Sequence, residues 1–165
     1  MVRWLLAMVC AVLAPWPSLA QTADDILAVI ETANALDHAV DAKDWDEAKS
    51  FFAEEITFSY GDAEPATMLS GDLVTMWSQN LYPAKTSFHL RGGHMVDFEG
   101  QTTATLYSKG YAYNHLEGFE GGSLWEVWGN YTYTLERSEG EWLITSFAFD
   151  PTHERGNIRI PSYRP

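Results

Sequence analysis

The stretch VDAKDWDEAKSFFAEEITFSYGD, residues 40–62, contains the change from helix to strand in this sequence. It holds the end of one predicted helix, a short second helix and the strand EITFSY at residues 55–60. Alternation along that strand places Ile56, Phe58 and Tyr60 on one face. Helices first and strand afterwards is the order expected of an α+β domain.

Residues 24–42 are predicted to form the first helix, because apolar side chains recur on one face at about 100° per residue. Thr22 or Asp24 can cap its start. The predicted face comprises Ile26, Val29, Ile30, Ala33, Asp37, Val40 and Asp41. Carboxylates are rarely buried without a partner, so Asp37 and Asp41 are candidates for chemistry. Alternatively, this end of the helix is exposed, with both carboxylates in solvent or one capping the next helix.

Two more helices are predicted in the first half of the chain. DWDEAKSFF forms a short helix at residues 44–52, and GDLVTMWSQNLY forms a third at residues 71–82. Ser70 is the predicted cap of the third helix, and Pro83 ends it. All three helices therefore precede the long strands.

The second half of the chain is predicted to be all strand. Four runs are rich in β-branched and aromatic residues: SFHLRGGHMVDF, TTATLYSKGYAYNHL, SLWEVWGNYTYTLE and EWLITSFAF. The dipeptides at 99–100 and 139–140, each Glu-Gly, predict hairpin turns, and the glycine pair at 92–93 predicts a bulge. The predicted fold class is α+β, a cone-shaped, curved, mixed or antiparallel sheet wrapped by the three helices. A pocket is expected at the wide end of the cone.

Residues 1–20 are predicted to be a signal peptide, because Arg3 precedes an apolar run that ends in the small-x-small pattern before Ala20. That run is too short to span a bilayer, so no stable membrane anchor is expected. Cleavage near Ala20 would remove the only cysteine, and a cysteine-free exported chain indicates a periplasmic or secreted protein. Residues 21–152 are the predicted domain. Residues 153–165 are a tail that either folds back or is disordered.

The charge and the motifs limit the function classes. The formal net charge of −13 repels phosphate backbones, so nucleic acid is not an expected partner. The sequence has no His-x-His and no HExxH pattern, and no metal site is expected. It also has no phosphate-binding glycine-rich loop and no G-x-S-x-G motif.

Two histidines lie in the predicted strands. His89 would point away from Phe88 and Leu90, toward either solvent or a buried cavity. His115 shares parity with a row of tyrosines at positions 107, 111 and 113. That row suits a half-polar pocket wall and equally suits an outer aromatic surface.

The stretch at 40–62 resembles the opening of the SnoaL-like branch of the nuclear-transport-factor-2-like superfamily, and within it the scytalone dehydratases. Members carry an Asp shortly before Lys-Asp-Trp, which matches Asp41 here, and then a strand tyrosine, which matches Tyr60. The family pattern H-x-x-G-G matches residues 89–93, and a second histidine falls on His115. A terminal D-G-x-W pattern appears as EGEW at 139–142. The resemblance covers roughly residues 22 to 150.

The resemblance implies an acid–base site without a cofactor. Asp41, His89, His115 and Tyr60 would be catalytic, and the substrate-binding wall would contain Val40, Phe58, Trp77 and Tyr131. The chain departs from the pattern, because Val40 replaces a family tyrosine, and Gly129 and Tyr131 replace polar residues of a later strand. The family enzyme is also intracellular and fungal. A different substrate is therefore expected.

Three functions stay open on the sequence alone. The first is a lyase or isomerase that acts on a small cyclic or aromatic carbonyl compound by proton transfer. The second is a non-catalytic module that binds a small hydrophobic or aromatic ligand in the same pocket. The third is an interaction domain, since alternating Tyr and Trp in two strands predict a homodimer through the outer sheet face.

Overall fold

Three helices and six strands follow one another over residues 21–165, the part of the chain that this computed structural model describes. The predicted signal peptide lies outside the described residues. The elements are α1 (Ala23–Ala42), α2 (Trp45–Ser50), β1 (Phe52–Tyr60), β2 (Ala66–Leu69), α3 (Ser70–Asn80), β3 (Thr86–Glu99), β4 (Thr103–His115), β5 (Leu124–Ser138) and β6 (Glu141–Gly156).

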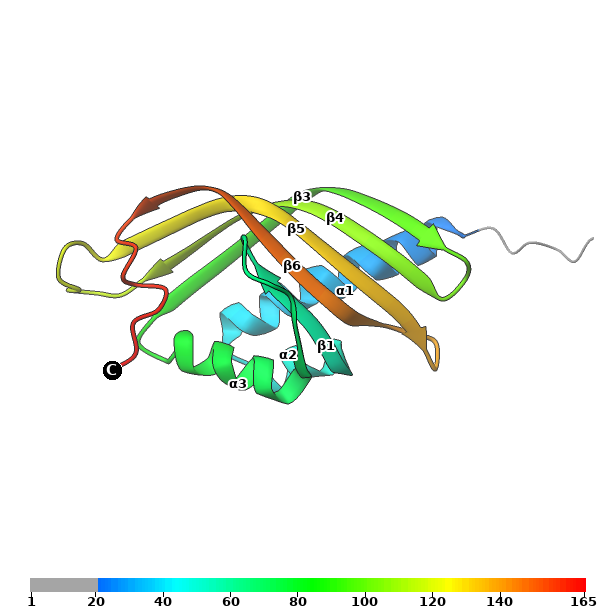
Figure 1. Cartoon of the computed structure of the whole chain (residues 1–165), viewed down its shortest axis with the longest axis horizontal. Helices are drawn as coiled ribbons and strands as arrows, with labels where there is room; N and C mark the ends of the chain where they lie inside the picture. The colour runs from blue at the N-terminus through cyan, green and yellow to red at the C-terminus, as the bar shows by residue number, and fades with distance from the viewer. Residues whose placement is uncertain (1–20) are drawn as a thin grey trace, which may run out of the picture.

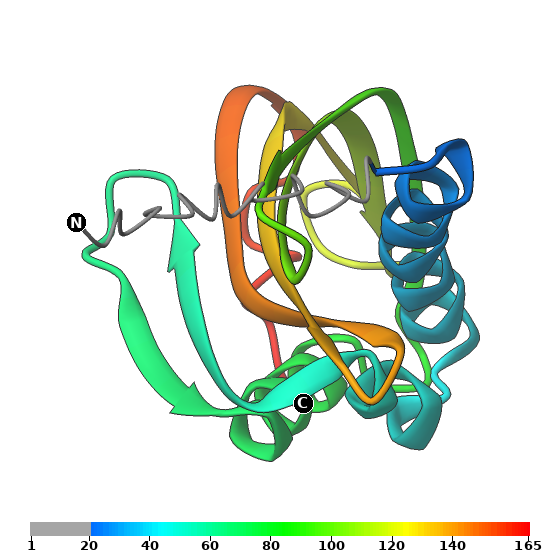
Figure 2. The same cartoon turned by 90° about the vertical axis from the view of Figure 1, so that its right-hand side faces the viewer.

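The strands form one curved sheet in the order β2-β1-β6-β5-β4-β3. Only β1 and β6 run parallel, and every other neighbouring pair is antiparallel. The long strands arch over the helices, which fill the concave side (Figures 1 and 2). The predicted α+β fold class is therefore confirmed. Sequence reasoning missed β2, a short edge strand that pairs with β1.

Helix α1 begins with a capping box, in which the Thr22 hydroxyl accepts from the Asp25 amide and the Asp25 carboxylate accepts from the Thr22 amide. Of the two predicted caps, Thr22 and Asp24, Thr22 is the one that caps the helix. The buried face is rotated slightly from the predicted one, which is seen in the first turn, where Ile26 is 40% exposed. The buried members are Val29, Ala33, Leu36, Asp37, Ala39 and Val40.

The predicted cap of the third helix is wrong. Leu69 is the residue that precedes α3, and no side chain caps its start. Ser70 is instead the first helical residue and is buried, because β2 runs directly into the helix. Helix α2 is also shorter than predicted, since Phe52 leaves it to begin β1 and enters the core.

The predicted turns and the predicted bulge are confirmed. Gly100 connects β3 to β4, while Glu139 and Gly140 connect β5 to β6, and all three have positive φ. The β3–β4 register shifts between Gly92 and Met95, next to Gly93 with φ 62°. This bulge bends the edge of the sheet that faces α1.

The C-terminal tail folds back on the body. Strand β6 continues to Gly156, so the predicted domain boundary at residue 152 falls inside a strand. Beyond it, Ile160 is fully buried, and its carbonyl accepts a 2.6 Å hydrogen bond from the buried Lys85 ammonium. Asn157 donates to two carbonyls of the β4–β5 connection. The tail thus covers one end of the sheet.

Candidate active site

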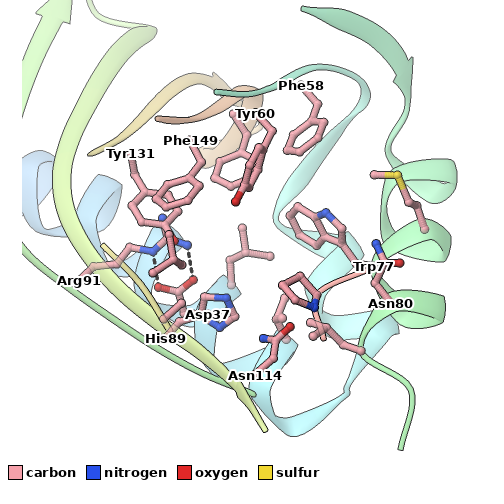
Figure 3. A pocket seen from close by; sticks show the side chains of 18 of the residues that line it. Asp37, Phe58, Tyr60, Trp77, Asn80, His89, Arg91, Asn114, Tyr131 and Phe149 are labelled. Carbon is pink, nitrogen blue, oxygen red and sulfur yellow. Dashed lines mark hydrogen bonds and ion pairs between the residues drawn. The ribbon is translucent and has the colours of Figure 1, made fainter. Parts of the chain in front are cut away.

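A cavity of about 350 Å³ lies between the concave face of the sheet, α1 and α3. Its lining is chiefly apolar, and includes Leu36, Val40, Phe58, Trp77, Val127 and Phe147. A few polar side chains enter it, namely Asp37, Tyr60, Asn80, His89, Arg91, Asn114 and Tyr131 (Figure 3). An apolar cavity with a few convergent polar groups is the usual form of a small-molecule site.

His89 and Asp41, both expected in the acid–base site, are in direct contact. Strand alternation turns His89 inward while Phe88 and Leu90 are exposed on the other face. Asp41, in the last turn of α1, accepts two hydrogen bonds from this one residue. His89 Nδ1 lies 2.8 Å from Asp41 Oδ1, and the His89 backbone amide donates to Oδ2 at 2.7 Å.

The bonds from His89 keep Asp41 ionised. Burial alone would raise the pKa of Asp41, but the side-chain bond, charge and backbone amide of His89 together hold that pKa below its usual value. A carboxylate can only accept, so in the neutral imidazole Nδ1 carries the proton and Nε2 has the free lone pair. The side chains of His89 and Asp41 are 18% and 21% exposed. The arrangement is one in which a neutral His89 could act as a base from the edge of the cavity.

Tyr60 lies across the cavity from His89, with its hydroxyl pointing inward (Figure 3). Its ring packs on Phe149 at 5.4 Å between centroids. Burial, helped by the charge of Glu154, raises the pKa of Tyr60. Tyr60 therefore remains a hydrogen-bond donor at neutral pH, in the position predicted for it.

His115 does not belong to this site, and the prediction that it joins His89 is wrong. In β4, Ala112 and Asn114 face the cavity, whereas His115 has the opposite parity. The nearest acid to its ring is Glu117, with 3.6 Å between His115 Nε2 and Glu117 Oε2. The tyrosine row that shares its parity forms the outer aromatic surface, which was the other interpretation left open.

The predicted substrate-binding residues all line the cavity. Val40 and Trp77 reach it from α1 and α3, and Phe58 and Tyr131 reach it from β1 and β5. Trp77 contacts Phe58 edge to face at 6.4 Å between centroids. These residues make most of the aromatic wall.

Sequence reasoning missed Arg91, which is the second polar feature of the cavity. The Arg91 guanidinium donates through Nε and Nη2 to the two carboxylate oxygens of Asp37. Their side chains are only 4% and 10% exposed. In the sequence, the family pattern H-x-x-G-G drew attention to His89 and to the glycines, and not to Arg91. Arg91 lies two residues after His89 in the same strand, and this shared parity indicates that it also points inward.

Two glycines make room for the aromatic wall. Gly110 and Gly129 are paired across β4 and β5. A Cβ atom at Gly110 would lie 2.2 Å from the Tyr131 ring, and one at Gly129 would lie 2.5 Å from the Phe149 ring. The two rings therefore lie where side chains of the sheet would otherwise stand.

Within residues 21–165, no three His, Cys, Asp or Glu side chains are arranged to hold a metal ion. Among the described helices, none is both long and apolar enough to cross a membrane.

A model of the SnoaL-like domain family matches residues 21–148. No curated protein matches the sequence significantly. Among solved structures, protein Kfla4162 from Kribbella flavida is 18% identical with a TM-score of 0.78, over 85% of this chain and 98% of that one. A candidate scytalone dehydratase from Novosphingobium aromaticivorans is 16% identical with a TM-score of 0.73, over 81% and 88%. A hexachlorocyclohexane dehydrochlorinase, LinA type 2, is 14% identical with a TM-score of 0.68, over 84% and 92%.

Proposed function

Because the chain belongs to the SnoaL-like domain family, we propose that it is a cofactor-independent lyase or isomerase. Its substrate would be a small cyclic or aromatic carbonyl compound, held in the apolar cavity. The observation that carries the proposal is the bond of 2.8 Å between His89 Nδ1 and Asp41 Oδ1 at the edge of that cavity. The pair would present a base to a ligand in that cavity.

The reaction would begin at His89. Nε2 takes a proton from the carbon next to the substrate carbonyl, and the C–H electrons move to form an enolate. Asp41 stabilises the imidazolium that results, while the Tyr60 hydroxyl donates to a substrate oxygen across the cavity. Return of the proton to another carbon completes an isomerisation. Its delivery to a departing β-hydroxyl breaks the C–O bond and releases water, which completes a dehydration.

The names of two structural neighbours agree with this class of chemistry. The LinA protein is named as a dehydrochlorinase, and the Novosphingobium protein as a candidate dehydratase. Each of those names describes an elimination. At 14% and 16% identity, these structures carry the fold and leave the activity of this chain as a proposal.

The proposal is tested by hydrogen exchange on a panel of cyclic and aromatic ketones, beginning with 2-tetralone, in D₂O. NMR follows the loss of the proton signals next to the carbonyl, with and without protein. We expect the wild type to accelerate exchange of at least one bound ketone, and Asp41→Asn to lose most of the acceleration. Binding of the ketones without accelerated exchange would contradict catalysis and leave a non-catalytic binding protein.

We also propose that the chain is exported and cleaved near Ala20. The support is the order of Arg3, apolar run and small-x-small pattern in residues 1–20. N-terminal sequencing of the exported protein should begin at Gln21. A mature protein that keeps the apolar run would contradict export with cleavage, without affecting the active-site proposal.

A homodimer through the convex face of the sheet is a further part of the proposal. Phe88, Leu90, Met95 and Tyr107 are large apolar side chains exposed on this face. A self-complementary patch of this kind suits a twofold dimer. Light scattering should give about twice the chain mass for the wild type. The Leu90→Glu variant should shift toward monomer, and a wild type that is monomeric at high concentration would contradict the dimer.

A further inference from the structure

We propose that Arg91 is a positioning residue that acts through Tyr131, so that this end of the cavity selects ligands with an anionic or strongly polarised oxygen, such as a phenolate or an enolate. The inference deepens the proposed function and rests on it only in placing the ligand in the same cavity.

The sheet register brings Arg91 and Tyr131 together. Arg91 pairs with Gly110 across β3 and β4, and Gly110 pairs with Gly129 across β4 and β5. Because Gly110 has no side chain, the Tyr131 ring lies over it and reaches the neighbouring strand. The Arg91 guanidinium carbon is then 3.6 Å from the centroid of the Tyr131 ring. This is a close cation–π contact in a buried setting.

Arg91 lines the cavity together with Asp37, but little of the Arg91 side chain is open to a ligand. Its side chain is 4% exposed, and Asp37 occupies Nε and Nη2. Nη1 is buried without a hydrogen-bond partner among the described residues, and so is the nearby Tyr133 hydroxyl. The Asp37 carboxylate balances the charge of the guanidinium, which keeps this one NH₂ group without a hydrogen bond in the described part of the chain. The action of Arg91 on a ligand is therefore expected to pass chiefly through Tyr131, whose ring lies against the guanidinium and lines the same cavity.

The pair of charges is oriented with its positive end toward Tyr131. In Figure 3 the guanidinium lies between Asp37 and the Tyr131 ring, so the cation is the nearer charge. Burial raises the pKa of Tyr131 to about 12, and Arg91 opposes that rise more strongly than Asp37 adds to it. Tyr131 thus keeps its proton, while the cation beside its ring makes the hydroxyl a stronger donor.

Tyr131 also has a second donor beside it. The Phe149 ring lies 4.2 Å from the Tyr131 ring and 5.4 Å from the Tyr60 ring, measured between centroids. Tyr131 and Tyr60 therefore flank one phenylalanine at the end of the cavity that lies across from His89 (Figure 3). Two protonated phenols, Tyr131 buried and Tyr60 42% exposed, favour an oxygen that carries negative charge over a neutral one.

The test uses 4-nitrophenol, whose absorbance separates the bound phenol from the bound phenolate. A pH titration of the complex gives the ratio of the two affinities. We expect the wild type to prefer the phenolate, and Tyr131→Phe to lose about tenfold of that preference. Arg91→Met should reduce the preference for the phenolate severalfold. Arg91→Lys should reduce it less, because lysine keeps the positive charge. Tyr133→Phe is the matched control, since it removes a buried hydroxyl that does not line the cavity.

The outcomes separate this inference from the proposed function. Equal affinity of the wild type for phenol and phenolate, or a full preference in Tyr131→Phe, would overturn it. A preference unchanged in both Arg91 variants would overturn the role of Arg91. If Arg91→Met does not fold, Arg91→Lys and Tyr131→Phe still decide the result. An Asp41→Asn protein that has lost hydrogen exchange should keep the phenolate preference, so failure of one proposal is visible without the other.

Discussion

Two pairs of side chains join α1 to β3, and they occupy equivalent places one helical turn apart. Asp41 meets His89 near the end of α1, and Asp37 meets Arg91 one turn earlier. Both acids come from one face of the helix, and both bases come from one face of the strand. The geometry is therefore repeated, while the chemistry of the base differs.

The difference lies in the mobility of a proton. A guanidinium stays charged at any pH at which a protein is folded, so the buried pair at Asp37 fixes charge and shape. An imidazole changes charge near neutral pH, so the pair at Asp41 can accept and return a proton. Both pairs line or adjoin one cavity. The contrast indicates that one pair is suited to chemistry and the other to holding the wall and its electric field.

The largest effect is expected from a substitution that breaks the pair of His89 and Asp41. His89→Gln should lower the exchange rate by a factor of about 10² to 10⁴, because the general base is removed while the shape is nearly kept. His115→Gln is the matched control and should retain the rate, since His115 lies on the outer face. Equal losses in the two variants would contradict the placement of the base at His89.

The next largest effect is expected from a substitution that breaks the pair of Arg91 and Asp37. Arg91→Met should lower the free energy of unfolding by about 3–5 kcal/mol, because it leaves the Asp37 carboxylate buried without its partner. Urea denaturation measures this change. Replacing both residues with Leu and Met should recover much of the loss. Full stability in Arg91→Met alone would show that the Asp37 carboxylate is not buried as the structure has it.

A smaller effect is expected from filling the space at Gly110, over which the Tyr131 ring lies. Gly110→Ala should cost about 1–3 kcal/mol of stability, because the added Cβ would lie 2.2 Å from the Tyr131 ring. Gly92→Ala is the control, since no atom lies within 4 Å of its added Cβ. Thermal unfolding compares the two variants. Equal stability would mean that Tyr131 does not lie over Gly110.

The smallest effect is the acid dependence of stability. The pKa of Asp41 lies below its usual value of 3.8, so the folded state binds this proton less readily than the unfolded state. The resulting stability is complete above pH 3.8 and is lost as the pH falls through the lower folded pKa. The stability gap between wild type and Asp41→Asn should therefore narrow below that pH. A gap that does not change with pH would contradict the charged pair, and Asp62→Asn on an exposed loop is the control.

The sequence predicted the elements that have local signals. Turn glycines, the capping threonine and the strand alternation that turns His89 inward are all readable from neighbours in the chain. The position of Asp41 four residues before Trp45 linked it to a known motif. These features depend on contacts or patterns within a few residues.

Other features depend on which strands become neighbours, and the sequence could not reveal them. Arg91 and Tyr131 meet only because Gly110 lies between them in the sheet register. The family motif predicts His115 in the site, but strand alternation turns it away from the cavity that the adjacent Asn114 lines. The folded-back tail depends on the amine of Lys85, which binds carbonyls 75 residues or more further along the chain.

The central claim is that the Asp41 carboxylate fixes the proton of His89 on Nδ1 and leaves Nε2 as the base. NMR of the histidine side-chain nitrogens, with the five histidines assigned, measures this directly. At mildly alkaline pH we predict that His89 carries its proton on Nδ1, and that Asp41→Asn changes this tautomer while the other four histidines keep theirs. A His89 protonated on Nε2 in the wild type, or one that does not respond to Asp41→Asn, would contradict the account.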